Sequence, residues 1–344
     1  MRSSRCFATH PDAGLVGAKL IYPDGRLQEA GGIVWRDGSA LELRPRRRSR
    51  TSPEYNYLRE ADYCSGACLA IPPRCSTTSA ASTAALCRQR TTKTSTSRLP
   101  SRAAGRQVFY QPLATVVHFE GQTSGTDETA GVKRHQVVNQ GDVRREMEHG
   151  ARVHRPNGVT AELEHDRWAQ LRVLVIDACM LTPDHDAGSL RMQAILEILT
   201  LAALQGDVRR RQPRVPATAT SSHRCSSRGV EVLFHPYVGS IAELLAKRGG
   251  EFDIVVMSRH YIAVKHIDAV RSFAPRALVV FDTVDLHFLR EERQAELEGS
   301  ALASAARTRS ATRSWRSSAR PTSRSSCRPV EQALLAEARA RTRA

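Results

Sequence analysis

The chain has 344 residues, enough for two domains of roughly 100–200 residues with separate cores. Its formal net charge is +16, but four arginine-rich windows hold more positive charge than the whole chain, so the remainder is acidic. No apolar run approaches the roughly 18–20 residues of a transmembrane helix, which excludes an integral membrane protein and allows at most a peripheral membrane association. The four arginine-rich windows are residues 41–52, 74–106, 209–228 and 303–328.

The eight cysteines are scattered without a paired CxxC spacing, and no apolar segment follows the basic start. Both features favour the reducing cytoplasm over secretion. A basic chain often binds nucleic acid or an anionic membrane surface. However, aromatic residues make up only 5% of the chain, and the windows do not repeatedly interleave them with arginine, which disfavours single-strand recognition. We therefore expect a cytoplasmic protein, at most on the inner face of the cytoplasmic membrane, with no specific nucleic-acid partner.

The first domain opens with a predicted strand, turn and strand. Residues 14–22 form an apolar, β-branched run, Pro23, Asp24 and Gly25 have strong turn chemistry, and residues 27–35 form a second extended run. Further predicted elements are strands at residues 63–71 and 114–119, the second preceded by an ordered segment at 107–112, and a helix at residues 132–148. The charged, proline-interrupted segment 149–170, with a short helical piece at 160–168, is predicted to be an interdomain linker.

A second domain is predicted from residue 171 onward. Apolar runs alternate with amphipathic helical segments, which indicates an α/β domain with a doubly wound parallel sheet. The strands are predicted at residues 171–177, 230–234, 252–257 and 277–282, and the helices at residues 190–204, 240–248 and 262–273.

Two motifs in the first domain carry a family resemblance. They are DYCSGACLAI at residues 62–71 and VVHFEG at residues 116–121, and together with residues 11–35 they resemble the bacterial family 2, rhamnosyltransferase-like glycosyltransferases. The resemblance covers about residues 8–147. It implies that residues 1–148 form an incomplete A-type nucleotide-diphospho-sugar transferase domain.

Such a transferase needs an Asp-x-Asp motif that holds Mg²⁺ or Mn²⁺ against the donor diphosphate, and a carboxylate base that deprotonates the acceptor hydroxyl. The family has the Asp-x-Asp upstream of the segment that begins at His10, so we expect this chain to lack it. Thr92, Lys93 and Thr94 stand where the family has the Glu-Asp motif of the base, so no catalytic residue is assigned.

The resemblance leaves a few candidate site residues in the first domain. Asp62, Ser65 and Gly66 are expected on the acceptor side. His118 occupies the place of a strand-end histidine that completes the metal site in many enzymes of this fold. The alternative is a histidine that is only hydrogen-bonded at the end of its strand, and without its carboxylate partners this second interpretation is favoured.

The second domain resembles the N-terminal half of a family 4-like, B-type glycosyltransferase over about residues 171–298, most closely at FDTVDLHFLREER, residues 281–293. The resemblance implies that residues 171–344 form an incomplete Rossmann-like domain whose cleft is lined by the loop after the first strand. On spacing alone, Ser189 could merely cap the following helix, and Asp285 could cap the next one. The candidate cleft residues are Asp186, Gly188, Ser189, Asp282 and Asp285.

The arginine-rich windows break the pattern of both domains. A basic low-complexity segment is ordinarily solvated, and we expect poor order at residues 74–106, 209–228 and 303–328. Shifting the reading frame by one base, with permitted GC-rich codons, turns residues 74–83 into ALFDDVGGFD, residues 92–98 into DEDIDLA and residues 314–329 into ELAVVRAADVTLVVSP. These are family-like segments, so frame-shifted text is preferred over a genuine basic insertion.

The sequence therefore predicts a truncated, frame-shifted fragment of a two-module glycosyltransferase. The intact enzyme is expected to move sugar from a nucleotide-sugar donor to a glycan or lipid-linked glycan acceptor of a cell-surface polysaccharide, and this chain is expected to be inactive. The alternatives are a basic protein that binds nucleic acid or a membrane surface through its arginine-rich windows, and the product of a decayed gene.

Overall fold

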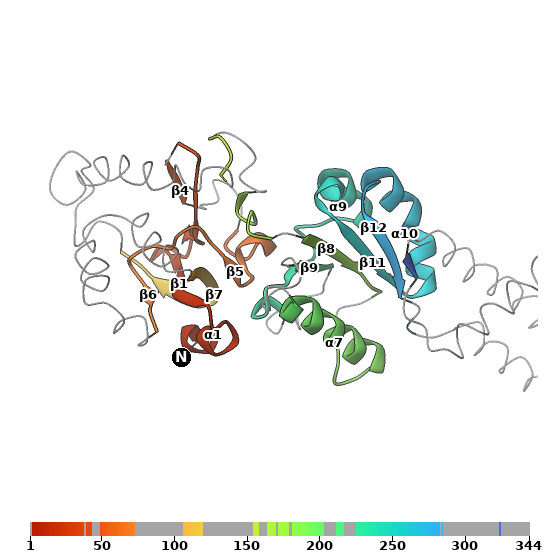
Figure 1. Ribbon diagram of the computed structural model, residues 1–344, viewed down its shortest axis with the longest axis horizontal. Helices are drawn as coiled ribbons and strands as arrows, with labels where there is room; N and C mark the ends of the chain where they lie inside the picture. The colour runs from red at the N-terminus through yellow and green to blue at the C-terminus, as the bar shows by residue number, and fades with distance from the viewer. Residues whose placement is uncertain are drawn as a thin grey trace, which may run out of the picture. The chain divides into compact units, whose positions relative to one another are not determined.

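The protein is a mixed α/β chain whose computed structural model divides into two compact units (Figure 1). The first comprises Met1–Gln170 with His223–Val230, and the second Leu171–Ser222 with Glu231–Ala344. The helix expected at 132–148 and most of the window 74–106 lie outside the described residues. The structure describes residues 2–37, 39–42, 49–72, 106–119, 154–157, 164–169, 171–178, 181–202, 211–216, 225–282, 284 and 323–324.

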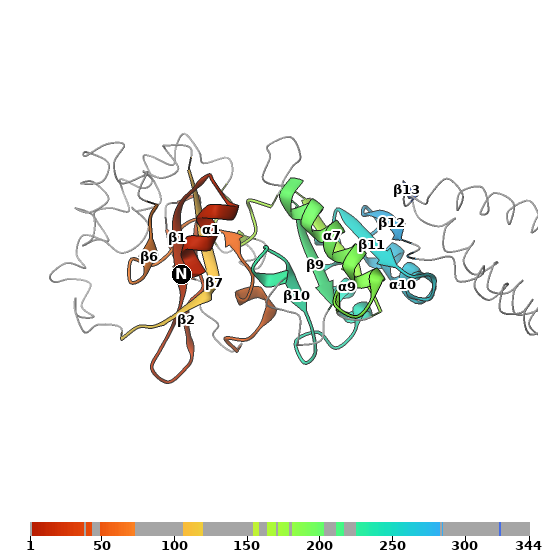
Figure 2. The same ribbon diagram turned by 90° about the horizontal axis from the view of Figure 1, so that it is seen from below.

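The first unit is built on a mixed sheet with the strand order β2-β1-β7-β5. The parallel pair β1 and β7 forms its centre, and β2, β5 and β6 are antiparallel to their neighbours. Helix α1 (Arg2–Thr9) lies against β1 and β7, as Figure 2 shows, and contributes Cys6 to the core. The strands are β1 (Ala13–Ile21), β2 (Leu27–Glu29), β5 (Arg59–Glu60), β6 (Leu69–Ala70) and β7 (Gln107–Val117).

Strand β1 is buried along almost its whole length because apolar residues cover both of its faces. Leu15 packs with Val108 on one face, and Val16 packs with Phe109 on the other. Gly17 is fixed by close packing, since a Cβ at this position would lie 2.1 Å from the Cβ of Cys64. An apolar run that serves two cores explains why this segment is the most regular in the first half of the sequence.

Three expected strands of the first unit differ in the structure. The run 27–35 breaks at Gly31, whose φ of +77° favours glycine, into β2 and a strand β3 (Gly32–Val34) that pairs with β4 (Ala40–Glu42). The run 63–71 contributes only β6 and an isolated bridge between Tyr63 and Gly32. The expected strand 114–119 joins the segment 107–112 in one longer strand, β7, which ends at Val117 and whose register against β1 shifts beyond Gln111.

The second unit contains a parallel sheet with the strand order β10-β9-β8-β11-β12-β13. In chain order this is 3-2-1-4-5-6, the doubly wound arrangement that reverses direction between β8 and β11. The strands are β8 (Leu171–Ile176), β9 (Arg211–Pro216), β10 (Glu231–Leu233), β11 (Ile254–Ser258), β12 (Leu278–Asp282) and β13 (Ser323–Arg324).

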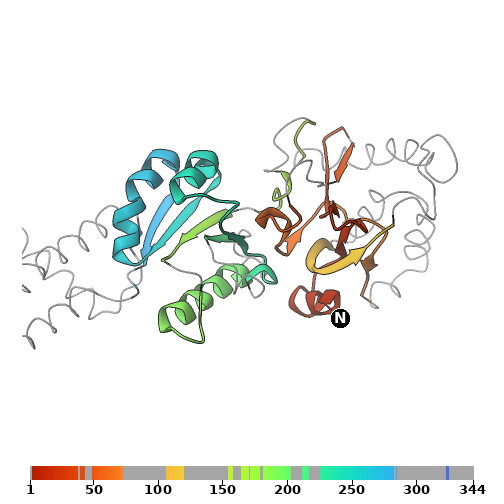
Figure 3. The same cartoon turned by 180° about the vertical axis from the view of Figure 1, so that it is seen from behind.

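Helices cover both faces of this sheet. Figures 1 and 3 show α9 (Ile241–Arg248) and α10 (His260–Phe273) on one face and α7 (Ala187–Ala202) on the other. Ser240 caps α9 by accepting a hydrogen bond from the Glu243 amide at 3.1 Å. The core between α9, α10 and the sheet is formed by aliphatic and aromatic residues such as Leu174, Leu245 and Val279. This arrangement places the carboxyl ends of β8, β11 and β12 along one edge.

Two strands fall in windows where we expected poor order. Strand β9 lies within 209–228 and β13 within 303–328, and most of the other residues of these windows lie outside the described ones. Strand β9 hydrogen-bonds to β8 on one side and β10 on the other, and these neighbours supply the pairing that its own sequence does not predict.

Candidate functional site

The carboxyl edge of the second unit carries charged side chains at the point where the strand order reverses. Asp177 follows β8, Arg259 follows β11, and Asp282 ends β12. In open α/β sheets, ligands bind outside the carboxyl ends of the strands at this switch point. The topology therefore brings together residues that are far apart in the sequence.

Arg259 connects the three loops at this edge. Its Nε lies 2.9 Å from Asp177 Oδ1 and its Nη2 lies 3.9 Å from Asp186 Oδ1, while its backbone amide donates to the Asp282 carbonyl at 2.9 Å. Its φ of +72° is unusual for a residue with a side chain. Such backbone strain concentrates at ligand sites and switch regions, which makes Arg259 a candidate functional residue.

Asp186 caps helix α7. Its carboxylate accepts hydrogen bonds from the Gly188 amide at 2.9 Å, the Ser189 amide at 3.1 Å and the Ser189 hydroxyl. The hydroxyl bond is the main cause that holds the pKa of Asp186 below its usual value. The cap is therefore Asp186 rather than Ser189, and the first amides of α7 point to a carboxylate of the chain itself.

Asp282 is buried and has two side-chain partners. Arg191 of α7 forms an ion pair with Oδ1, and the Ser258 hydroxyl donates to Oδ2 at 3.4 Å. A Cβ at Gly188 would lie 3.1 Å from a side-chain methyl of Val284, so Val284, after β12, packs closely on the first turn of α7. The edge carries three carboxylates, Asp177, Asp186 and Asp282, and two guanidinium groups, Arg191 and Arg259, joined by ion pairs.

Part of this group is predicted by the sequence. Asp186, Gly188, Ser189 and Asp282 all lie at the carboxyl edge, and Asp285 lies outside the described residues. Arg259, Arg191 and Asp177 were missed. Asp177 and Arg259 directly follow predicted strands, which was the available signal. Arg191 lies on a helix face, and no such signal in the sequence marks it.

In the first unit, Asp62 is buried and belongs to a polar network. Its carboxylate accepts from the Val34 amide at 2.8 Å and from Trp168 Nε1 at 2.8 Å, and it forms an ion pair with Arg167. His154 Nδ1 lies 4.0 Å from the same carboxylate. With its side chain only 2% exposed, Asp62 anchors neighbouring segments in this structure.

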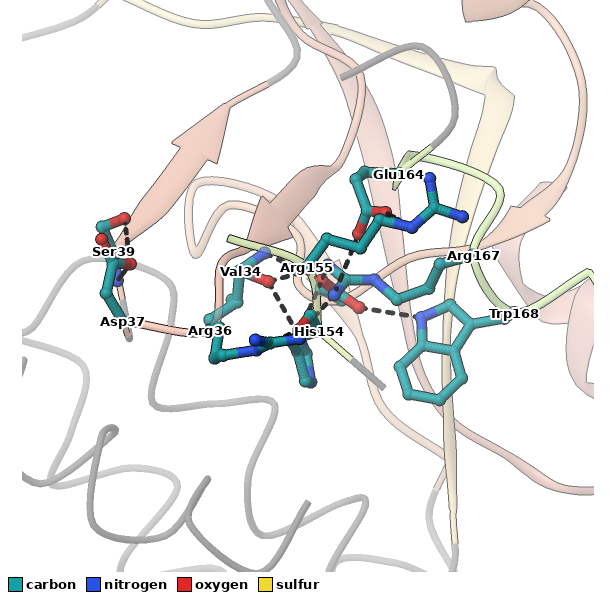
Figure 4. A network of polar contacts seen from close by, with 10 residues as sticks. Val34, Arg36, Asp37, Ser39, His154, Arg155, Glu164, Arg167 and Trp168 are labelled. Carbon is teal, nitrogen blue, oxygen red and sulfur yellow. Dashed lines mark hydrogen bonds and ion pairs between the residues drawn. The ribbon is translucent and has the colours of Figure 1, made fainter. Parts of the chain in front are cut away.

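The other members of the network bind the segment that we expected to be a linker to the first unit. Arg36 donates to the His154 carbonyl at 3.0 Å, while Glu164 lies 3.1 Å from Arg155 and 3.3 Å from Arg167 (Figure 4). His154 also packs edge-on against Trp168, with ring centroids 6.3 Å apart. Residues 154–157 and 164–169 are thus part of the first unit.

The remaining predicted residues of the first unit have separate surroundings. The Ser65 amide donates to Glu29 Oε1 at 2.7 Å, and His118 Nδ1 lies 3.1 Å from Gln28 Oε1. Because neighbouring strand residues point to opposite faces, Ser65 and His118 are not brought together. Gly66 is exposed. Thr92, Lys93 and Thr94 lie outside the described residues.

Neither a metal site nor a membrane-spanning helix is found in the part of the chain that the structure describes. No group of three or more histidine, cysteine, aspartate or glutamate side chains there is placed to hold a metal ion. None of the helices described is both long and apolar enough to cross a bilayer. Comparison with protein-family models, with curated proteins and with solved structures finds no significant match for this chain.

Proposed function

We propose that the chain carries parts of two glycosyltransferase modules and that the second unit binds a nucleotide sugar or a glycan at its switch point. The intact enzyme would move sugar from a nucleotide-sugar donor to a glycan or lipid-linked glycan acceptor of a cell-surface polysaccharide. The sequence motifs of both halves and the doubly wound strand order support this proposal.

The observation that carries the proposal is the position of Arg259. It is a non-glycine residue with positive φ, it lies at the switch point, and it joins the loops after β8 and β12. Guanidinium groups bind phosphate oxygens, whereas carboxylates accept hydrogen bonds from sugar hydroxyls. The side-by-side arrangement of Arg259, Arg191 and Asp282 suits a ligand that has both groups.

Catalysis by the first unit is proposed to be weak or absent. The family mechanism requires a divalent metal, Mg²⁺ or Mn²⁺, and a carboxylate base, and Thr92, Lys93 and Thr94 supply no carboxylate. His118 is the remaining candidate ligand, and its Nδ1 contacts Gln28. Loss of a general base alone lowers the rate by about 10²–10⁴-fold.

Calorimetric titration of the full chain with UDP-glucose, dTDP-rhamnose and GDP-mannose tests the binding step. We expect Arg259→Gln to lower the affinity for the bound donor, and the exposed Arg276→Gln, which removes the same charge from the same unit, to leave it unchanged. Thermal unfolding of both variants shows whether the second unit stays folded. Equal affinity of a folded Arg259→Gln variant and the parent chain would refute the assigned site.

The net charge of +16 favours a second candidate function, binding to nucleic acid or to an anionic membrane. Titration with duplex DNA and with phosphatidylserine vesicles at increasing salt separates the two candidates. A basic binder loses affinity steeply with salt on both surfaces. Nucleotide-sugar binding that persists in 0.5 M salt, without DNA or vesicle binding, favours the glycosyltransferase proposal.

A further inference from the structure

Strand β1 carries a buried lysine in the first unit. Lys19 is 6% exposed, and its ammonium group donates a hydrogen bond to Asn56 Oδ1. An ammonium group has further N–H donors that this bond does not use. Burial, together with the nearby positive charges of Arg59 and Arg50, lowers the pKa of Lys19 from 10.5 to about 8. The lysine therefore lies in an environment that disfavours its own charge.

Arg50 and Arg59 are the neighbouring cations that act on Lys19. Within the described ranges, neither Lys19, Arg50 nor Arg59 forms an ion pair with a carboxylate. Arg59 is 2% exposed, donates to the Glu54 carbonyl at 3.1 Å and faces the Tyr110 ring at 4.7 Å. Arg50 is exposed and donates to a backbone carbonyl. Buried charges are normally ion-paired, whereas buried Lys19 and Arg59 have no ion-pair partner within the described ranges.

Asn56 connects Lys19 to the loop that carries Arg50. Its Nδ2 donates to the Arg50 carbonyl at 3.0 Å and to the Ser52 carbonyl at 2.7 Å, while its Oδ1 accepts from Lys19. Two further donors of this group are buried without a hydrogen-bond partner among the described residues: the hydroxyl of Ser52, a residue that is 1% exposed, and Nε of Arg59. Buried polar groups are nearly always satisfied, so these atoms point to a missing acceptor.

We propose that Lys19, Arg50, Ser52 and Arg59 form a binding site for the phosphoryl group of a small molecule. A phosphate ester supplies negative charge for the cationic cluster and several acceptor oxygens for the unused donors. Exposed Arg50 provides the side that a ligand can reach, and the buried cations lie behind it. The site belongs to the first unit and does not depend on the proposed function of the second.

The test is calorimetric titration of the full chain with inorganic phosphate, pyrophosphate, glycerol phosphate and UDP at constant ionic strength and pH 7. We expect the Kd for the phosphoryl ligands to rise by about tenfold to a hundredfold in Lys19→Met and in Arg50→Gln, because each removes a charge-assisted hydrogen bond. Arg276→Gln, which makes an equal change in net charge in the second unit, should leave the Kd unchanged.

The variants also separate binding from a purely structural role. Lys19→Met should raise the midpoint of thermal unfolding in the absence of phosphate, because it removes an uncompensated buried charge, and should lose the stabilisation that phosphate gives the parent chain. Binding of all four ligands identifies a phosphate subsite, and binding of UDP and pyrophosphate alone identifies a diphosphate subsite. No phosphoryl binding, or binding equal in the parent, Lys19→Met and Arg50→Gln, would overturn the proposal.

Discussion

The buried ion pair between Asp62 and Arg167 yields a quantitative prediction. In Asp62→Asn, the Arg167 side chain, only 4% exposed, loses its aspartate partner. Removing one member of a buried pair typically costs about 3–5 kcal/mol, because the other charge stays buried and uncompensated. Glu164 Oε2 remains 3.3 Å from Arg167 and reduces this effect, so we expect a loss of about 3 kcal/mol in the free energy of unfolding of the first unit.

Urea unfolding followed by tryptophan fluorescence measures this loss, because Trp35 is buried in the first unit and Trp168 donates directly to Asp62. The matched control is Asp37→Asn, which makes the same change at an exposed residue close by and should alter the stability by less than about 0.5 kcal/mol. The double variant Asp62→Asn with Arg167→Met should be less destabilised than the sum of the single variants by about 1–3 kcal/mol.

If Asp62 served mainly to hold a ligand, its replacement would change ligand binding and leave unfolding almost unaffected. An Asp62→Asn variant as stable as Asp37→Asn would therefore refute the anchoring role. The same outcome would restore Asp62 as an acceptor-side residue.

Three further predictions concern single positions. Folding lowers the pKa of Lys19 from 10.5 to about 8, so the unfolded chain binds more protons than the folded chain between these two pH values. The free energy of unfolding of the parent chain should therefore rise across this range by up to about 3 kcal/mol relative to Lys19→Met, as measured by urea unfolding. Gly17→Ala should destabilise the first unit by about 3 kcal/mol because its Cβ meets Cys64, whereas Gly66→Ala, with no atom within 4 Å of the added Cβ, should change the urea midpoint little. Asp186→Ala should lower the thermal stability of the second unit by about 1 kcal/mol, because α7 loses its cap, and an unchanged melting midpoint would contradict that role.

The second unit was the more predictable of the two because its elements follow local patterns. The continuous apolar runs at β8, β11 and β12 indicate strands covered on both faces, and the capping serine before α9 indicates a helix start. The carboxyl-edge site followed from topology, since loops after parallel strands meet at one edge. Arg191 could not be predicted, because its partner Asp282 is distant in sequence.

The first unit was less predictable because its decisive contacts are long-range. The sequence of residues 27–35 predicts one strand. In the structure this run breaks at Gly31 because of the backbone conformation of that residue. The network around Asp62 joins residues more than a hundred positions apart, such as Asp62 and Trp168. The polar residues of this network have no periodic pattern. The charged, proline-interrupted segment 149–170 is therefore predicted to be a linker, although it contributes to the first unit.

The sequence of strand β9, which lies in one of the arginine-rich windows, is unusual for its position in the sheet. A strand inside a doubly wound parallel sheet normally reads as a continuous apolar run, and proline is confined to edges because it has no amide to donate. Strand β9 lies between β8 and β10, yet its sequence is RQPRVP, with Pro213 aligned against Val173 of β8. The sheet thus places a strand where the sequence is least suited to one.

The disagreement between the sequence of β9 and its place inside the sheet leads to a prediction about the coding DNA for residues 209–228. If this window is frame-shifted text, a neighbouring reading frame should encode a short apolar, β-branched run at the position of β9, without proline, and the arginines should disappear from the translation. Restoring that frame should make the second unit unfold cooperatively at a higher temperature, since the paired strand would then bury apolar side chains on both faces. Stop codons in both alternative frames across this window would leave RQPRVP as the genuine strand, and the basic-binding function would then become the stronger proposal.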